Sequence, residues 1–178
     1  NMTKEEFKSR LETLQYDKFY QDIDYIDFVG YSKSYETWDR IKSIFDWKDK
    51  KVADLGAFHG YFSFKIAELG GIVTAMDRSP IVLETTEILN QCYGSPIKTQ
   101  VWVGGEEVPE EFDISLCLNA LHHFGDQEKA LKNIKSEFAL FEVKYDQCFL
   151  ITQYFDIFKK VQSHRIGRII LLGRKRNE

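Results

Sequence analysis

Two acids and two glycines between residues 51 and 77 have the types and the spacing to bind a nucleoside. One short apolar run ends at Asp54, Gly56 and Gly60 bracket a tight loop, and a second apolar run ends at Asp77. Where a strand turns sharply into a helix, the first helical N–H groups lack intrahelical partners, and glycines let a ligand approach that backbone. An acid after the second strand can accept hydrogen bonds from ribose hydroxyls. The pattern predicts a nucleoside-cofactor site at the carboxyl edge of a parallel sheet.

The glycine loop differs from the dinucleotide fingerprint G-x-G-x-x-G. Phe58 occupies the place of the central glycine, and His59 follows it. Asp54 lies two residues before the first glycine, where it would repel a pyrophosphate but suits a cationic or zwitterionic ligand. A nicotinamide cofactor is therefore disfavoured. We expect Phe58 to narrow the cofactor pocket, and His59 to shape the loop rather than act as a base.

Strands and helices alternate on both sides of this loop. Apolar runs predict strands at residues 51–54, 72–76, 97–103, 113–119, 138–143, 156–163 and 168–173. Helical spacing and caps predict helices at residues 3–14, 34–45, 61–69, 79–92, 127–134 and 145–154. Only residues 164–167 join the last two strands, which must be antiparallel because a parallel pair needs a crossover of about a dozen residues.

The stretch DLGAFHGYFSFKIAELGGIVTAMD and the closing hairpin resemble the class I S-adenosylmethionine-dependent methyltransferases. This resemblance covers about residues 51–175. It implies an α/β, Rossmann-like, doubly wound sheet of seven strands in the order 3-2-1-4-5-7-6, with strand 7 antiparallel. Residues 51–178 are expected to form one compact cofactor-binding domain, and residues 1–50 a helical cap in which Tyr31, Ser34 and Tyr35 could form a lid.

The resemblance implies S-adenosyl-L-methionine as the cofactor and assigns roles residue by residue. Asp54 and the loop backbone would hold the methionine portion, Asp77 the ribose, and Asn119 the amino group. Arg78 would flank the adenine, and Glu106 is a weak substitute for the acid that usually follows strand 3. The expected cofactor-binding residues are Asp54, Gly56, Ala57, Phe58, Gly60, Asp77, Arg78, Glu106 and Asn119.

His122 and His123 follow strand 4, where substrate-facing groups lie in open α/β folds. Imidazole suits proton removal because its ordinary pKa is near neutrality. The two residues are the candidates for catalysis, and a purely structural histidine pair is the alternative. The sequence around them, LHHF, is similar to that of many small-molecule methyltransferases.

Composition narrows the partners further. The 178 residues carry a net charge of -4, which does not favour a general attraction to phosphate backbones. Three separated cysteines, Cys92, Cys117 and Cys148, argue against a disulfide framework or a zinc cluster. We expect a cytoplasmic enzyme with no metal site and no membrane contact, acting on a small molecule more readily than on nucleic acid. The sequence leaves the oligomeric state open.

Two alternatives stay open. One is a degenerate methyltransferase-like domain that binds or scaffolds without catalysis. The other is a nucleic-acid methyltransferase that uses the basic residues near the C-terminus. These residues are Lys159, Lys160, Arg165, Arg168, Arg174, Lys175 and Arg176.

Overall fold

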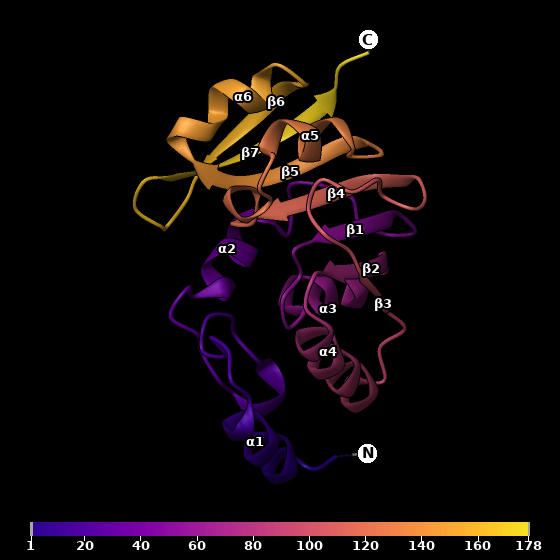
Figure 1. Cartoon of the computed structure of the whole chain (residues 1–178), viewed down its shortest axis with the longest axis vertical. Coiled ribbons are helices and arrows are strands. Elements are labelled where there is room, and N and C mark those ends of the chain that lie inside the picture. Colours follow the sequence, from indigo (N-terminus) through magenta and orange to yellow (C-terminus); the bar gives the residue numbers. More distant parts are fainter. Residues whose placement is uncertain (1, 178) are drawn as a thin grey trace.

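The computed structural model describes residues 2–177, in which one mixed sheet is flanked by helices (Figure 1). The strands are β1 Lys51–Leu55, β2 Ile72–Asp77, β3 Lys98–Val101, β4 Phe112–Leu118, β5 Ser136–Lys144, β6 Phe155–Gln162 and β7 Arg168–Lys175. Their order is β3-β2-β1-β4-β5-β7-β6, as expected from the sequence. β7 is antiparallel to β5 and to β6, and the other neighbouring strands are parallel. The predicted α/β architecture is therefore confirmed.

The helices between these strands follow the predicted order. They are α1 Lys4–Thr13, α2 Ser34–Ile41, α3 Tyr61–Glu68, α4 Pro80–Tyr93, α5 Gln127–Lys132 and α6 Cys148–Thr152. Short 3₁₀ helices are η1 Asp24–Ile26, η2 Leu121–His123 and η3 Tyr145–Gln147. Among residues 2–177, no helix is long and apolar enough to cross a membrane.

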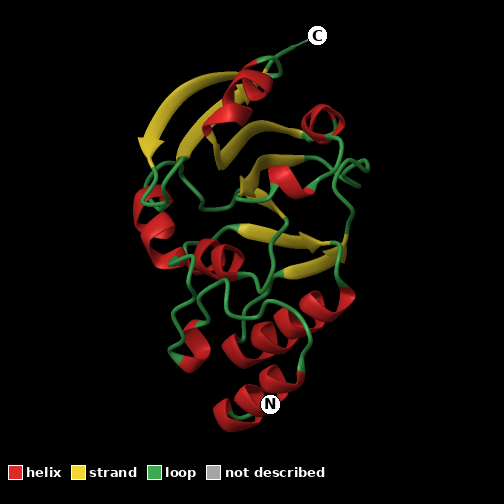
Figure 2. Cartoon of the chain, turned by 60° about the vertical axis from the view of Figure 1, so that its left-hand side comes forward, coloured by secondary structure: helices red, strands yellow, loops and turns green. Residues whose placement is uncertain are grey.

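The sheet has an apolar core on each face, because successive strand residues point to opposite sides. In β1, Val52 belongs to the core that α2, α3 and α4 cover, whereas Ala53 belongs to the core that α5 and α6 cover. Figure 2 shows helices on both sides of the sheet. The chain changes faces between β1 and β4, which are parallel neighbours. Open α/β sheets bind ligands in the crevice outside such a switch point.

The N-terminal segment, residues 2–50, lies beside the carboxyl ends of β4 and β5, at the lower left of Figure 1. Thr3 and Glu6 form a capping box that starts α1. Asp22 fixes the following loop, since its carboxylate accepts hydrogen bonds from the backbone N–H groups of Gly30, Ser34 and Tyr35. These hydrogen bonds give the segment a defined structure next to the switch point between β1 and β4.

Two predicted helices differ from the observed ones. α2 ends at Ile41 instead of residue 45, and the carbonyl of Lys42 accepts a hydrogen bond from Trp47 Nε1 at 3.0 Å. The helix expected over residues 145–154 is divided into η3 and α6. Hydrophobic periodicity does not define such helix ends closely.

Candidate functional site

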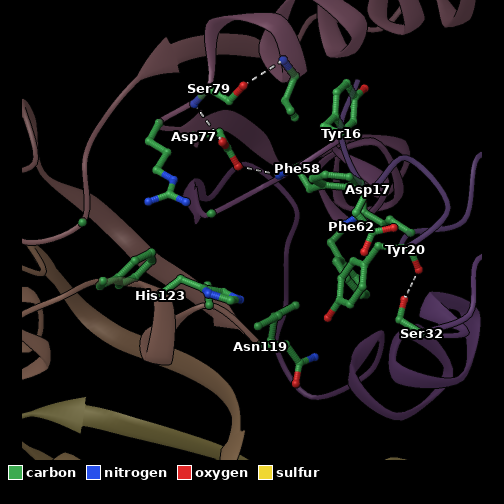
Figure 3. Close-up of a pocket in the computed structure, with 18 of the residues that line it drawn as sticks. Tyr16, Asp17, Tyr20, Ser32, Phe58, Phe62, Asp77, Ser79, Asn119 and His123 are labelled. Carbon is green, nitrogen blue, oxygen red and sulfur yellow. Dashed lines mark hydrogen bonds between the residues drawn. The ribbon is translucent and has the colours of Figure 1, made fainter. Parts of the chain in front are cut away.

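A cavity of about 840 Å³ opens at the carboxyl edge of the sheet, between the strand ends and the N-terminal segment (Figure 3). Its size lies in the range of roughly 300–1,000 Å³ that is common for small-molecule and cofactor sites. Residues from the ends of β1, β2 and β4 form one wall, and the N-terminal segment forms the other. The wall at the strand ends includes Gly56, Phe58, Asp77, Arg78, Asn119 and His123. The wall from the N-terminal segment, called the N-terminal wall below, includes Tyr16, Tyr20, Tyr31, Ser32 and Thr37.

The glycine loop lines the base of this cavity. Gly56 has a φ of 76°, and its N–H donates to the Met76 carbonyl at 2.9 Å. A Cβ at this position would lie 2.8 Å from Ala120 Cβ, which is closer than side-chain atoms pack. Gly60, with a φ of 86°, caps α3. The glycines thus allow a left-handed backbone and a close approach of the loops after β1 and β4.

Asp77 lies at the end of β2, and two backbone N–H groups fix the orientation of its carboxylate (Figure 3). Oδ2 accepts from the Phe58 N–H at 3.1 Å, and Oδ1 accepts from the Ser79 N–H at 3.0 Å. Each carboxylate oxygen can accept more than one hydrogen bond. Asp77 therefore keeps the capacity to accept from two vicinal hydroxyls, and the arrangement fits a ribose. The neighbouring Arg78 also lines the cavity.

Phe58 forms part of the cavity wall without closing the cavity. Its ring stacks on His59 with the centroids 4.2 Å apart, and it meets Tyr16 and Tyr20 edge to face. His59 is buried, and its Nε2 lies 2.6 Å from Tyr16 Oη. Burial lowers the pKa of His59 to about 3, so the ring is neutral near pH 7. His59 thus fastens the loop to the N-terminal segment.

Asp54 lies beneath the loop, outside the residues that line the cavity. Its Oδ2 accepts from Ser63 Oγ, in the first turn of α3, at 2.7 Å. Burial raises the pKa of Asp54 to about 6. Ala57 and Gly60 are also buried behind the lining. Binding of the methionine portion by Asp54, Ala57 and Gly60 stays a prediction, in which the buried carboxylate would act through its negative potential.

Asn119 faces the cavity from the end of β4 in a left-handed conformation, with a φ of 58°. Its Nδ2 donates to Glu142, and its Oδ1 accepts from the Arg168 guanidinium. Glu142 is fully buried and also accepts from Thr37 Oγ1 at 2.9 Å and from Ser163 Oγ at 2.8 Å. Glu142 therefore joins α2, β4 and the segment after β6 beneath the cavity. Sequence reasoning missed it, although it is the one acid within the apolar run at residues 138–143.

The two candidate catalytic histidines lie in η2, and only His123 lines the cavity. Their ring centroids are 3.9 Å apart. Burial is the largest cause that lowers the pKa of each, in His122 to about 4, and neighbouring cations lower both further. His122 is thus neutral near pH 7, and His123 shares this preference. The geometry brings His123 to the cavity, and the catalytic role of both stays a prediction.

Glu106 does not reach the cavity. Its side chain is exposed, and its carboxylate accepts from the Val103 N–H at 3.5 Å. Trp102 and Gly104 line the cavity at that place. A contact between Glu106 and adenine stays a prediction, and the lining offers an indole instead. Within residues 2–177, no group of three or more His, Cys, Asp or Glu side chains is placed to hold a metal ion.

The N-terminal wall supplies aromatic residues that sequence reasoning did not assign individually. Tyr16 and Tyr20 line the cavity, as does Tyr31 from the expected lid, whereas Tyr35 does not. Gln21 ties this wall to the loop, because its Oε1 accepts from the Tyr61 N–H at 3.1 Å and its Nε2 donates to the Ala57 carbonyl at 3.4 Å. Six aromatic residues among residues 16–31 were the available signal.

The geometry fits S-adenosylmethionine. A hollow of suitable volume has glycine backbone at its base, a carboxylate for the ribose at one strand end and aromatic walls for an adenine. Comparison with known proteins agrees. Residues 53–137 match the family model described as a methyltransferase domain.

Curated relatives also match this chain. A tRNA U34 carboxymethyltransferase from Campylobacter fetus is 33% identical over 108 residues, which are 58% of this chain and 38% of the relative. One of the same name from Campylobacter hominis is 27% identical over 150 residues, covering 79% of this chain and 51% of the relative. The chain thus spans about two-fifths to one-half of the length of these relatives.

Solved structures share the fold. PH0226 from Pyrococcus horikoshii aligns with a TM-score of 0.71 at 11% identity, over 94% of this chain and 99% of that chain. A putative S-adenosylmethionine-dependent methyltransferase from Listeria monocytogenes aligns with a TM-score of 0.67 at 16% identity, over 82% of this chain and all of that one. At such identities the likeness concerns the fold.

The relatives correct one expectation from the sequence. Preference for a small molecule over nucleic acid as partner is wrong, because the curated relatives are named as enzymes of tRNA. The preference depended on the net charge of -4 and on the similarity of LHHF to small-molecule methyltransferases. The net charge averages over the whole surface and does not describe the charge around the site. Residues 53–137 thus match the methyltransferase-domain family, and the strand order and the solved structures show the Rossmann-like fold of class I S-adenosylmethionine-dependent methyltransferases.

Proposed function

We propose that this chain is the catalytic domain of an enzyme that transfers a methyl or carboxymethyl group to a uridine of tRNA. The observation that carries the proposal is the 33% identity to a tRNA U34 carboxymethyltransferase over 108 residues. The cavity supports it, because a cofactor wall and an aromatic wall face each other across one space. Such a space can hold a nucleoside donor and a planar acceptor base.

The cofactor would lie along the strand ends. Asp77 would accept from the ribose hydroxyls, and the backbone at Gly56 would let the sulfur end approach β4. When bound, S-adenosylmethionine supplies a carbon activated by a sulfonium. The chain itself then has to align the acceptor with that carbon and exclude water.

The acceptor base would lie between the strand ends and the N-terminal wall. Tyr20 and Phe62 border this space and could stack on a uracil, as aromatic side chains do on unstacked RNA bases (Figure 3). His123 could remove a proton from the acceptor, because its imidazole tends to be neutral near pH 7. In this proposal the strand ends bind the cofactor, and the N-terminal wall contacts the acceptor base.

A transfer assay tests this function. We would incubate the chain with a tRNA transcript that has uridine at position 34, using S-adenosylmethionine or the corresponding carboxymethyl sulfonium as donor. Mass spectrometry of the digested nucleosides should reveal a uridine derivative with the added group. A transcript with cytidine at that position is the matched control and should stay unmodified. The proposal would be contradicted if the transcript with uridine at position 34 stayed unmodified with both donors, or if the control transcript were modified to the same extent.

A further inference from the structure

We propose that Lys144, Arg165 and Arg168 form a cationic rim that binds RNA phosphates beside the cavity. This inference rests on the proposed function and adds the surface by which the polynucleotide is held. The rim differs from the basic C-terminal edge considered from the sequence, because only two of those seven residues belong to it.

The sheet register brings the three cations together. Lys144 ends β5 and is the direct antiparallel partner of Arg168, which begins β7. The connection between β6 and β7 carries Arg165, whose carbonyl accepts from the Arg168 N–H at 3.2 Å. Figure 1 shows this connection at the left, on the same side as α2 and the N-terminal segment. The rim therefore lies at the carboxyl edge of the sheet, where the cavity opens.

Two rim residues touch residues that line the cavity. Arg165 Nη1 donates to Tyr20 Oη at 2.7 Å, and its guanidinium lies 5.5 Å from the centre of that ring. The Arg168 guanidinium donates to Asn119 Oδ1. An RNA strand that contacts the rim would thus have a base within reach of the cavity.

The rim charges are not neutralised by ion pairs. Across residues 2–177, Lys144, Arg165 and Arg168 form no ion pair with a carboxylate. Glu142 attracts Arg168, but it is buried and bonded to Thr37, Asn119 and Ser163. Like charges directly opposite in an antiparallel pair oppose sheet formation, so the fold gives no reason for Lys144 to face Arg168. A bound polyanion would offset the repulsion between Lys144 and Arg168.

Exposed apolar side chains lie among these cations. Tyr145 is 51% exposed, and its N–H donates to the Gly167 carbonyl at 3.2 Å, beside the hairpin connection. Ile166 is fully exposed at the tip of that connection. Cations that contact phosphates, next to an aromatic ring that can stack on a base, are the usual elements of a single-stranded RNA surface. We therefore favour RNA over an acidic protein as the partner.

The other end of the same hairpin provides a matched comparison. Arg174 pairs with Glu137 at 3.1 Å, and Arg176 pairs with Asp156 at 3.1 Å. Arg174 lies six residues beyond Arg168 along β7, a separation of about 20 Å at the usual strand rise. These cations are neutralised and distant from the cavity, so they should contribute little to RNA binding.

Two double variants test the rim by salt-dependent binding of the tRNA transcript. Both K144Q/R165Q and R174Q/R176Q remove two positive charges. We expect K144Q/R165Q to weaken binding on the order of tenfold and to reduce the slope of log K against log salt by about 1.4, since each single-strand phosphate contact contributes about 0.7. R174Q/R176Q should bind as the unchanged chain does. S-adenosylhomocysteine should bind equally to both variants.

The possible outcomes distinguish failure of the rim proposal from failure of the proposed function. Unchanged affinity and slope in K144Q/R165Q, or an equal loss in R174Q/R176Q, would overturn the rim while leaving tRNA as substrate. Absence of tRNA binding by the unchanged chain would overturn both. If K144Q/R165Q also loses binding of S-adenosylhomocysteine, the single variant K144Q decides, because Lys144 is exposed and does not line the cavity. Its slope should fall by about 0.7.

Discussion

Asp54 illustrates at the residue scale how a buried acid can oppose stability. Burial beneath the glycine loop raises its pKa from an ordinary 3.8 to about 6. An acid with a raised folded-state pKa stabilises the fold below its unfolded pKa and loses that contribution as the pH rises through the folded pKa. The window for Asp54 therefore runs from about pH 3.8 to about pH 6. At neutral pH its ionised carboxylate is a cost to folding that a cationic ligand would relieve.

Asp54→Asn should accordingly stabilise the free chain at pH 7. We expect the free energy of unfolding to rise by roughly 1–3 kcal/mol, because a pKa difference of one unit corresponds to about 1.4 kcal/mol and Asn Oδ1 can still accept from Ser63. Urea denaturation at pH 7 and at pH 3.5 measures the effect. Since the unfolded acid keeps most of its proton at pH 3.5, the two chains should differ little there. An equal difference at both pH values would contradict this account of Asp54.

Individual site residues were unevenly predictable from the sequence. The two acids and the glycines were visible because a tight loop and a strand end restrict the residue types that fit there. Glu142, Tyr16 and Tyr20 were not assigned, since their roles depend on contacts with residues distant in sequence, as between Thr37 and Glu142. Distant contacts of this kind leave no periodic signal.

At the element scale, Glu142 joins structures that are separate in sequence. Its carboxylate accepts from Thr37 on α2, from Asn119 after β4 and from Ser163 after β6. Buried donors that lose their acceptor each cost roughly 1–3 kcal/mol, so the carboxylate stabilises the junction between the N-terminal wall and the sheet. The junction also sets the orientation of Asn119 in the cavity.

Glu142→Ala should therefore lower the free energy of unfolding by roughly 3–5 kcal/mol, because it leaves a group of buried partners unpaired. Glu137→Ala is the matched control on the same strand. Its carboxylate is exposed and pairs with Arg174, and an exposed pair contributes about 0–1 kcal/mol. Urea denaturation of both variants provides the comparison. Similar losses in the two variants would exclude a junction role for Glu142.

Elements were more predictable than their boundaries. Continuous apolar runs predicted the strands of the parallel sheet, and the four-residue connection at 164–167 predicted the antiparallel ending, which the structure confirms. β3 is shorter than expected, at Lys98–Val101, because the chain leaves the sheet at Trp102. Trp102 is buried instead in the core on the α5 face. Tertiary packing of that kind overrides local propensity.

On the scale of the whole molecule, charge is distributed in a way that the net value hides. The overall charge is -4, yet three cations that form no ion pair within residues 2–177 lie beside the cavity, whereas Arg174 and Arg176 are paired at the other end of the hairpin. Association with a polyanion depends on the local field and not on the sum. The partner was therefore the part of the function that composition predicted incorrectly. Strand register, which composition does not contain, determines where each basic residue lies.

Binding of S-adenosylhomocysteine to the unchanged chain and to Asp77→Ala, measured by isothermal titration, tests the cofactor site most directly. The unchanged chain should bind, and Asp77→Ala should bind at least about tenfold more weakly, because the ribose hydroxyls lose a charged acceptor. Asp39→Ala, which removes an exposed carboxylate paired with Lys42, is the control and should bind normally. Circular dichroism should be the same for all three chains. No binding by the unchanged chain, or equal affinity in Asp77→Ala, would contradict the assignment of this cavity as the cofactor site.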